Sequence, residues 1–446
     1  MKRVLIANRG EIAARIIKTC RRLGIETVAV YSDADRDLPY LEQATVARRI
    51  GEPPAAKSYM KIDALIEAAK ATGCDAVHPG YGFLSENPAF VRAVEEAGLV
   101  FIGPDAEAVR LMGDKIAARA HMKAAGVPVV PGSDHPVTTP DEAAAVADRV
   151  GYPVMLKAAA GGGGIGMVRC ADREALERAF VSTQTRAKTY FGNAALFIEK
   201  AIEGGRHIEV QIFGDKSGRV IHLFERECSV QRRHQKVVEE APAPSLSEAT
   251  RRAITQAAVR AARAVRYHNA GTVEFIVDAD EKFYFLEMNT RLQVEHPVTE
   301  AITGLDLVEW QVAVADGQPL SLGQDDIRPR GAAVEFRLYA EDPETFYPSP
   351  GTIEAWACPD IEGVRVDTGY AAGSPVPPFY DPMIAKVIVH APDRAAVLQK
   401  ARRFFTGMTI RGIKTNQALH LKLLSDPRFV AGQYDTSLLN RMAKEK

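Results

Sequence analysis

The sequence predicts a multidomain protein that joins an α/β region to α+β regions, and three observations support this class. Strand-like and helix-like segments alternate near the N-terminus, and glycines end the helices. A run of glycines then separates two strand-like segments. From His207 on, polar and apolar residues alternate as they do in antiparallel strands. The chain has 446 residues, which suffices for about two to four domains.

The N-terminal region, residues 1–113, is predicted to form a parallel sheet with crossover helices. Lys2–Ala7 is expected to be a buried strand, and the helix after it ends at Gly24. This order of strand and helix is typical of a Rossmann-like domain. The remaining elements are expected as a strand at Glu26–Tyr31, a helix at Ile62–Ala71, a strand at Ala76–His78, a helix at Pro88–Ala97 and a strand at Val100–Ile102.

The central region is predicted to cover residues 114–330 and to include a smaller α+β unit at about residues 131–203. A stretch rich in glycine and proline, Ala125–Pro136, leads into that unit. The third region, residues 331–446, is expected to mix strands, turns and helices. Central strands are expected at Pro153–Ala159, Met167–Cys170, Ala195–Lys200, His207–Phe213, Val220–Glu227, Thr272–Val277 and Phe283–Met288, and helices at Arg173–Phe180 and Glu248–Val265.

The composition argues against several classes of protein. The net charge is −1, whereas a nucleic-acid-binding protein normally carries a basic excess. No apolar run approaches the roughly 18 residues that span a bilayer. The N-terminal residues do not resemble a secretory signal, and the five cysteines are scattered. We therefore expect a cytoplasmic protein with free thiols that binds neither nucleic acid nor membrane.

The glycine run is a candidate phosphate-binding element. Gly161, Gly163 and Gly166 satisfy the pattern GxGxxG. A dinucleotide site would need a helix directly after the glycines, but Met167–Cys170 is strand-like, and no P-loop motif occurs. A strand–glycine–strand hairpin can instead close over a triphosphate through its backbone N–H groups. A loop that is merely flexible is the alternative.

Two lysines support a phosphate site. Lys157 lies inside an apolar strand, where an ammonium group is costly to bury unless an anion meets it. Lys115 precedes the glycine- and proline-rich stretch, and it could equally be a solvated surface lysine. Together with the glycine run, they make a triphosphate the favoured ligand of the central region.

A pair of carboxylates in the predicted hairpin at residues 272–289 indicates a metal site. Glu274 and Glu287 fall on the same face of the two strands, where like charges repel unless a cation lies between them. Asn289 shares this face and adds a neutral oxygen. Oxygen ligands of this kind suit Mg²⁺ that bridges phosphates, although a solvated polar face remains the alternative.

The same face is predicted to continue beyond the hairpin. If the chain stays extended, Arg291, Gln293 and Glu295 point in the same direction as Glu287, and they add a cation and a possible base. A compact basic cluster, Arg232–Lys236, lies between acidic residues and is too short for a nucleic-acid patch, so we expect a local anion site there.

Several sequence strings resemble the biotin carboxylases of the ATP-grasp superfamily. The resemblance runs from Lys2 to about Leu439 and implies a Rossmann-like N-terminal domain, an ATP-grasp domain with a mobile glycine-rich lid, and a mixed C-terminal domain. The strings that carry it are Asn8-Arg-Gly-Glu-Ile-Ala, His78-Pro-Gly-Tyr-Gly-Phe-Leu-Ser-Glu-Asn, Glu225-Arg-Glu-Cys-Ser-Val-Gln-Arg-Arg-His-Gln-Lys, Glu287-Met-Asn-Thr-Arg-Leu-Gln-Val-Glu-His and Ala340-Glu-Asp-Pro.

The resemblance implies roles for individual residues. Glu274, Glu287 and Asn289 would hold Mg²⁺ or Mn²⁺, Glu295 would deprotonate bicarbonate, and Arg337 would stabilise the biotin enolate. Bicarbonate would be bound by Lys236, Arg291, Gln293, Val294 and Glu295. ATP would be contacted by Lys115, Lys157, Gly163, Gly164, Glu199, Lys200, Ala201, Ile202, His207, Gln231, His234, Glu274 and Glu287.

The implied reaction is the ATP-dependent carboxylation of biotin through carboxyphosphate, and positive charges with Mg²⁺ would stabilise the transferring phosphoryl group. Two features depart from the family pattern. Ile165 stands where many members have Arg or Lys in the lid, and no Met-Lys-Met biotinylation motif occurs. We therefore expect biotin to arrive on a separate biotin carboxyl carrier protein, with carboxyltransferase subunits as further partners and a homodimer as the assembly.

Alternative functions stay open at this point. The final acceptor could be acetyl-CoA, which would place the protein in fatty acid biosynthesis, or propionyl-CoA, methylcrotonyl-CoA or pyruvate. Another ATP-grasp ligase, acting on a purine ribonucleotide or making carbamoyl phosphate, would keep the ATP residues but has little reason to carry Arg291, Glu295 and Arg337. A non-catalytic subunit would be expected to lack Glu274, Glu287 or Arg291, and all three are present.

Overall fold

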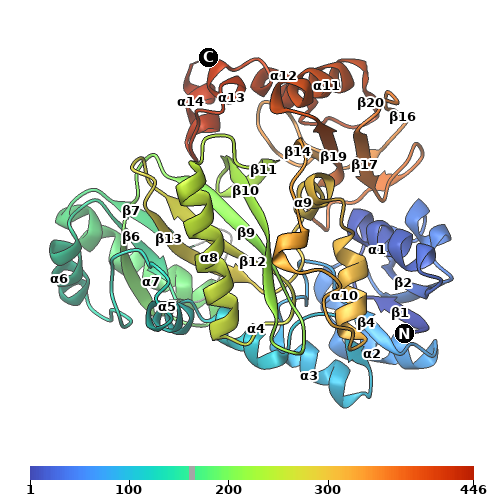
Figure 1. Ribbon diagram of the computed structural model, residues 1–446, viewed down its shortest axis with the longest axis horizontal. Helices are drawn as coiled ribbons and strands as arrows, with labels where there is room; N and C mark the ends of the chain where they lie inside the picture. The colour runs from blue at the N-terminus through green and yellow to red at the C-terminus, as the bar shows by residue number, and fades with distance from the viewer. Residues whose placement is uncertain (160–165, 446) are drawn as a thin grey trace.

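The computed structural model describes residues 1–159 and 166–445, and its three main sheets follow one another along the chain (Figure 1). A five-stranded sheet lies near the N-terminus, a three-stranded sheet comes next, and an eight-stranded sheet spans the middle and the C-terminal part. Helices pack against all three sheets. This mixed α/β architecture confirms the fold class predicted from the sequence.

The five-stranded sheet is parallel, with the strand order β3-β2-β1-β4-β5. An order that reverses direction next to β1 is typical of Rossmann-like sheets. Strand β3 was not predicted, because it lies at the edge of the sheet and carries two arginines between its apolar ends. The elements are β1 (Arg3–Ile6), α1 (Gly10–Arg22), β2 (Glu26–Ser32), β3 (Val46–Gly51), α2 (Ile62–Ala71), β4 (Ala76–His78), α3 (Pro88–Glu96) and β5 (Val100–Phe101).

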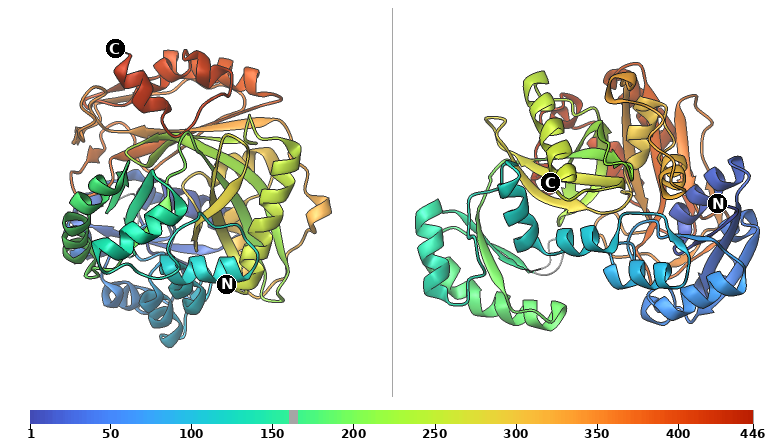
Figure 2. Two further views of the ribbon diagram at one scale, coloured as in Figure 1. Left: turned by 90° about the vertical axis from the view of Figure 1, so that its left-hand side faces the viewer. Right: turned by 60° about the horizontal axis from the view of Figure 1, so that its bottom comes forward.

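The three-stranded sheet is antiparallel, with the order β7-β6-β8, and belongs to a small unit that we call the lid unit (residues 131–159 and 166–203). Its buried apolar residues form a core of their own between Val137 and Ile198. The unit lies at one end of the molecule, far from α1 (Figures 1 and 2). The elements here are α4 (Ala106–Gly113) and α5 (Lys115–Ala124), which precede it, then α6 (Pro140–Val150), β6 (Val154–Ala158), β7 (Met167–Cys170), α7 (Arg173–Phe191) and β8 (Leu196–Lys200).

The eight-stranded sheet is antiparallel, with the order β13-β12-β9-β10-β11-β14-β19-β17. Strand β11 pairs directly with β14, so the predicted boundary at residue 330 falls between two strands of one continuous sheet. Helix α8 packs on β9 and β10, and α9 packs on β14 and β19. The strands are β9 (Arg206–Gly214), β10 (Val220–Arg232), β11 (Gln235–Ala241), β12 (Asn269–Val277), β13 (Phe283–Asn289), β14 (Ala332–Tyr339), β17 (Val364–Thr368) and β19 (Met383–Ala391), and the helices are α8 (Glu248–Ala264), α9 (His296–Thr303) and α10 (Leu307–Ala315).

The remaining elements are short strands and helices, most of them in the C-terminal part. The strands are β15 (Gly351–Thr352), β16 (Ala355–Ala357), β18 (Pro375–Val376) and β20 (Thr409–Arg411), and the helices are α11 (Arg394–Gly407), α12 (Gln417–Leu423), α13 (Pro427–Val430) and α14 (Leu438–Lys444). Short 3-10 helices lie at Asp33–Asp35, Pro39–Gln43, Ala55–Lys57 and Gln324–Asp326.

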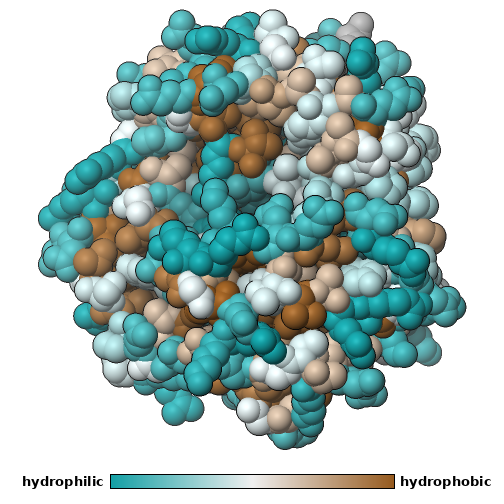
Figure 3. Space-filling model, turned by 90° about the vertical axis from the view of Figure 1, so that its right-hand side faces the viewer, coloured by the Kyte–Doolittle hydropathy of each residue, from teal (hydrophilic) through white to brown (hydrophobic). Residues whose placement is uncertain are grey.

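Two features of the surface and the side chains bear on the expectations from composition. Among the described residues, no helix is both long and apolar enough to cross a membrane. Figure 3 shows a face on which hydrophilic side chains separate the apolar patches. All five cysteines are free, as predicted, and four of them are buried.

Candidate active site

A cavity of about 640 Å³ brings together side chains from the N-terminal region, the lid unit and the eight-stranded sheet. This volume suits a small ligand or cofactor. Most of the predicted site residues line it. They are Lys115, Lys157, Glu199, His207, Gln231, His234, Lys236, Glu274, Glu287, Asn289, Arg291, Gln293, Val294 and Arg337.

Several predicted residues lie elsewhere. Gly163 and Gly164 lie outside the described residues, so the predicted contact of the glycine run with phosphates stays a prediction. Lys200 is not part of the cavity wall, because its Nζ donates to the carbonyl oxygens of Gly151 and Tyr152 at 2.9 and 2.8 Å. Ala201 and Ile202 follow it outside the wall. Glu295 is fully buried beneath the cavity.

Lys157 carries the positive charge that the lid unit brings to the cavity. It forms an ion pair with Glu199. Its Nζ lies 2.5 Å from one oxygen of Glu199, and Arg119 of α5 lies 3.2 Å from the other oxygen. The apolar residues of β6 and β8 face the core of the lid unit, so Lys157 and Glu199 meet Arg119 on the opposite, cavity side. Sequence reasoning missed Arg119, because an arginine on a helix before a linker carries no signal of its own.

Three glutamates stand side by side across the sheet. Glu209 on β9 lies opposite Glu274 on β12, and Glu274 lies opposite Glu287 on β13. The predicted pairing of Glu274 with Glu287 is thus confirmed. Like charges in adjacent positions of a sheet destabilise it unless cations lie between them. Glu209 was missed, although the alternation of His207, Glu209 and Gln211 could have placed it on this face.

The cation among these carboxylates is Lys236. Its Nζ bonds to Glu209 (2.5 Å), Glu274 (2.8 Å) and Glu295 (2.7 Å). Burial disfavours the charge of this lysine, but the three carboxylates together raise the pKa of Lys236 well above its usual range. The fully buried Arg226 pairs with the other oxygen of Glu209, so Glu209 is neutralised from two sides.

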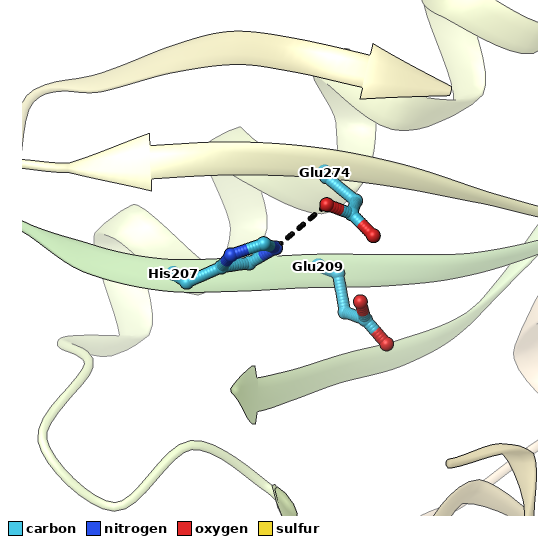
Figure 4. A group of neighbouring side chains, drawn as sticks. All are labelled: His207, Glu209 and Glu274. Atoms are coloured by element: carbon cyan, nitrogen blue, oxygen red, sulfur yellow. Dashed lines mark ion pairs between the residues drawn. The ribbon is translucent and has the colours of Figure 1, made fainter. Parts of the chain in front are cut away.

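Figure 4 shows the ion pair between His207 and Glu274, the glutamate that Lys236 also contacts. His207 Nε2 lies 2.8 Å from Glu274, and Gln231 lies 2.8 Å from the other ring nitrogen. Burial would lower the pKa of His207, but Glu274 raises it above its usual value. Burial alone would raise the pKa of Glu274, whereas the charges of Lys236 and His207 lower it strongly. Glu274 is therefore ionised, with His207 Nε2 beside its carboxylate.

The metal-ligand set predicted for Mg²⁺ matches the geometry in part. Glu287 is partly exposed, and Lys115 Nζ lies 3.7 Å from its carboxylate. Glu274 already accepts hydrogen bonds from Lys236, Asn289 and Gln293 through one oxygen. Two carboxylates in register and a neighbouring amide oxygen are the hard ligands that Mg²⁺ takes, so the donor set fits this ion.

The prediction that the chain stays extended from Glu287 to Glu295 is wrong. Strand β13 ends at Asn289, because β13 is the edge strand of the sheet and the next backbone N–H, that of Thr290, donates to Glu86. The chain then turns into α9 at His296. Even so, the side chains converge, because they bond to one another rather than alternate on a strand.

Arg291 is the centre of that convergence. It donates to Asn289 at 2.9 Å, to Gln293 at 2.8 Å and to Glu86 at 2.7 Å. Burial opposes the charge, but Glu86 and the neighbouring carboxylates raise the pKa of Arg291. Sequence reasoning missed Glu86. It lies in the string that begins at His78, yet nothing local to that string shows that it meets a residue about 200 positions later.

Arg337 is buried rather than exposed on a strand surface. Its guanidinium bonds to Glu239 (2.7 Å) and Glu295 (2.9 Å), and its side chain is 11% exposed. Arg337 is therefore not part of a surface pair with Glu341, which pairs with Arg232 instead. Burial alone would raise the pKa of Glu295, but Lys236 and Arg337 hold it well below its usual range.

The basic cluster Arg232–Lys236 spans a tight hairpin turn at the cavity mouth. Arg233 and His234 both have positive φ, 50° and 66°, between the paired residues Arg232 and Gln235. This backbone suits a two-residue hairpin, but side chains other than glycine adopt it at a cost. Arg232 anchors the turn through Glu341, so His234 and Lys236 are presented to the cavity, as a local anion site requires.

Three family models match the chain. They are described as biotin carboxylase, N-terminal domain (residues 1–109), carbamoyl-phosphate synthase L chain, ATP binding domain (residues 114–322), and biotin carboxylase C-terminal domain (residues 335–441). Together they cover most of the chain. The first and third carry the name of the family that the sequence strings resemble.

Individual proteins agree with these models. The chain is 54% identical over 445 residues to a biotin carboxylase of Halalkalibacterium halodurans, covering 100% of this chain and 98% of the relative. It is 48% identical over 439 residues to a pyruvate carboxylase subunit of Methanothermobacter thermautotrophicus, covering 98% and 89%. A solved structure with a TM-score of 0.96, 45% identity and coverage of 99% and 97% is the biotin carboxylase domain dimer of the Hydrogenobacter thermophilus 2-oxoglutarate carboxylase, in complex with MgADP, ADP and bicarbonate.

Proposed function

This chain belongs to the biotin carboxylase family of ATP-dependent ligases, and from that premise we propose which residues carboxylate biotin with bicarbonate and ATP. The observation that carries the proposal is the position of Glu295. It lies between Lys236 and Arg337, so one carboxylate joins a cation at the phosphate side to a cation at the far side of the cavity. A transfer in two steps is favoured when groups that serve both steps are held close together.

ATP is proposed to bind between the lid unit and the sheet. Lys115, Lys157 and His234 would meet the phosphates, and Glu199, His207 and Gln231 would complete the wall. Lys157 and Glu199 neutralise one another in this structure, and a bound phosphate would take over the lysine. Glu274, Glu287 and Asn289 would hold Mg²⁺ or Mn²⁺, which would neutralise charge on the transferring phosphoryl group.

Bicarbonate is proposed to bind beside Arg291, Gln293, Val294 and Lys236. Arg291 is fixed by three side chains and the carbonyl oxygen of Leu292, so its one remaining N–H presents a rigid donor to the anion. Attack of a bicarbonate oxygen on the γ-phosphorus of ATP forms carboxyphosphate and releases ADP. Glu295 would take the proton that bicarbonate loses in this step.

Glu295 is a weak base while both cations hold it, because its pKa is depressed by Lys236 and Arg337. A general base works best when its pKa lies near the working pH. When Lys236 turns to bicarbonate or Arg337 turns to biotin, one of these contacts is lost and Glu295 becomes more basic. The proposed base is therefore activated by the substrates themselves.

Arg337 is proposed to stabilise the biotin enolate. Carboxyphosphate splits into CO₂ and phosphate, the phosphate takes the N1′ proton of biotin, and the enolate then attacks CO₂ through nitrogen. Negative charge develops on the ureido oxygen before that attack, and a positioned guanidinium stabilises it. Closure of the lid unit would exclude water from carboxyphosphate, which is readily hydrolysed.

The partners are proposed on the family premise. A separate biotin carboxyl carrier protein would deliver biotin, and carboxyltransferase subunits would use the product, with acetyl-CoA as the first candidate acceptor. Propionyl-CoA, methylcrotonyl-CoA and pyruvate are alternatives, and the similarity to a pyruvate carboxylase subunit supports keeping pyruvate among them. A homodimer is supported by the dimeric relative. A cytoplasmic location stays a prediction.

The test is a radiolabel assay with free biotin. Purified protein, MgATP and labelled bicarbonate should yield carboxybiotin together with ADP, and omission of bicarbonate should stop ADP release. Ammonium or a purine ribonucleotide should not replace biotin as the acceptor. ADP release that depends on either of these instead of biotin would support another ATP-grasp ligase and contradict the proposal.

A further inference from the structure

We propose that His296 and Lys386, two buried side chains outside the cavity wall, position the bicarbonate pocket by fixing the two peptide groups that flank Val294. This inference rests on the proposed role of Val294 and Glu295 in binding bicarbonate. His296 holds the peptide before Val294, and Lys386 holds the peptide after it. Both are positioning residues, since neither is among the described residues that line the cavity.

His296 fixes the first of the two peptides. Its Nδ1 lies 2.8 Å from the carbonyl oxygen of Gln293, and the ring is fully buried at the start of α9. Burial, with the charges of Lys386 and Arg15, holds the pKa of His296 well below its usual range, so the ring is neutral. A carbonyl oxygen can only accept, so the proton of the neutral ring must lie on Nδ1.

Lys386 fixes the second peptide. Its Nζ donates to the carbonyl oxygen of Val294 at 2.8 Å and lies 3.1 Å from the carboxylate of Glu11. Lys386 is fully buried on β19, and Glu11 lies in the first turn of α1. The C-terminal and N-terminal parts of the chain therefore meet at a single peptide next to the proposed base, Glu295.

Fixing a carbonyl fixes the rest of its peptide, because the peptide group is planar. With the carbonyl of Gln293 turned to His296, the N–H of Val294 must point the opposite way, and Val294 lines the cavity. With the carbonyl of Val294 turned to Lys386, the backbone of Glu295 is also set. One N–H donor and one carboxylate are thus oriented by groups that never touch the substrate.

The cost of this arrangement supports a role beyond stability. An ammonium group with no exposure is expensive to bury, and well-packed apolar residues often replace buried ion pairs without loss of stability. Lys386 lies opposite Arg337 on β14 and Asp367 on β17, and Glu335 lies nearby without a hydrogen bond from any described residue. The ammonium group of Lys386 is thus kept among several other buried charges. What it contributes there is a fixed orientation of the peptide after Val294.

The experiment measures how Lys386→Met changes the KM for bicarbonate and the KM for ATP in the assay with free biotin. Loss of a residue that orients a directly binding group typically costs about 10–100-fold. We expect the KM for bicarbonate to rise by that factor while the KM for ATP changes less than about twofold. Equal changes in both constants, or no change in either, would overturn the proposal.

Lys400→Met is the matched control. Lys400 of α11 also donates from its Nζ to backbone carbonyls, those of Glu362 and His390, but near the C-terminal end of β19 and away from Val294. We expect both KM values to stay at the wild-type level in this variant. A rise in the KM for bicarbonate as large as that of Lys386→Met would show a general effect of the strand and contradict positioning.

Two further variants keep the proposal testable if Lys386→Met does not fold. The double variant Glu11→Gln with Lys386→Met leaves no charge of the pair buried alone and should show the same selective rise. His296→Leu should also raise the KM for bicarbonate. His296→Asn should raise it less, because the amide of asparagine can still donate to the carbonyl oxygen of Gln293. Inactive wild-type protein would contradict the proposed function, whereas active wild type with an unchanged KM in these variants would contradict the positioning alone.

Discussion

The lid unit and the eight-stranded sheet face the same cavity, yet they hold their charges in different ways. The lid unit contributes one partly buried cation, Lys157, and pairs it with Glu199 of the same unit. The sheet buries a network in which Lys236 alone contacts three carboxylates, and strands from the middle and the C-terminal part supply its members. One region can change position without breaking many ion pairs, and the other cannot.

The difference follows from how each region is built. The lid unit has a core of its own, made within residues 137–198, so its packing does not depend on the rest of the molecule. The charges of the sheet are held by strands that pair through a continuous ladder. Charges oriented before the substrate arrives need no reorganisation during reaction. We infer that the sheet provides fixed electrostatics and that the lid unit provides access and closure.

The strongest test of the fixed network is Arg337→Ala. Loss of a positioned donor to a developing oxyanion costs about 10²–10³ in rate, so biotin carboxylation should fall by that factor. Bicarbonate-dependent ATP cleavage without biotin should fall much less, because carboxyphosphate forms before the enolate. Both rates are measured on one preparation, with Arg252→Ala, an exposed helix residue, as control. Equal losses would show that Arg337 is needed for the fold of the network instead.

Glu239→Gln tests the network through pH. Burial, with a smaller effect of Glu295, raises the pKa of Glu239 from 4.5 to about 7 despite Arg337. Between these values the folded protein keeps a proton that the unfolded chain releases, so this contribution to stability is present below pH 4.5 and lost as pH rises through about 7. Glutamine cannot ionise. As pH rises through this window, the unfolding free energy of the variant should therefore increase relative to that of wild type by about 1.4 kcal/mol per pH unit. Denaturant unfolding at several pH values measures this, and a pH-independent difference would contradict it.

Glu287→Gln probes the boundary between the two regions, because Glu287 lies on the edge strand of the sheet and faces Lys115 of α5, the helix that leads into the lid unit. The Mg²⁺ concentration for half-maximal ATP cleavage should rise about tenfold, or about 1.4 kcal/mol, while the melting temperature stays near that of wild type. Asp280→Asn, in the exposed turn of the same hairpin, should leave the Mg²⁺ dependence unchanged. Normal activity of Glu287→Gln at low Mg²⁺ would remove it from the metal site.

The smallest expected effect is a change in amide hydrogen exchange on nucleotide binding, and this change should differ clearly between the lid unit and the eight-stranded sheet. With a non-hydrolysable ATP analogue, amides of the lid unit should exchange several-fold more slowly, because closure reduces local opening of a unit with a small core. Amides of β9, β10 and β12 should change little, since their ladder is already complete. Equal slowing in both regions, or none in the lid unit, would contradict the division of roles.

Local patterns in the sequence predicted many of the elements and one part of the site, although strand β3 was missed. The alternation in the segment 272–289 predicted that Glu274 and Glu287 face each other, because register in a hairpin is a local property. The alternation of strand-like and helix-like segments, with glycines that end the helices, is also a local pattern, and it predicted the parallel N-terminal sheet. Local patterns also favoured Lys157 as a phosphate ligand and Glu274, Glu287 and Asn289 as metal ligands. Bicarbonate and biotin as ligands of the remaining residues came only from resemblance to a family.

Contacts between distant segments were not predictable in this way. Lys236 meets Glu209, Glu274 and Glu295 because four separate segments converge, and no spacing in the chain records that. Arg337 meets Glu239 and Glu295, which lie 98 and 42 positions earlier in the chain, and no local pattern records these contacts. The strand was expected to continue beyond Asn289, but it ends there because the N–H of Thr290 donates to Glu86 instead of to a neighbouring strand.

The direct pairing of β11 with β14 has a consequence for any attempt to divide the chain. A fragment that stops at residue 330 would keep β11 but lose its neighbour, and it would expose a row of unpaired backbone N–H and C=O groups. It would also leave Glu239 and Glu240 without Arg337 and Arg394, the arginines that now neutralise them. Such an edge is a template for pairing with other copies, so the shortened protein should aggregate rather than fold as a soluble nucleotide-binding module.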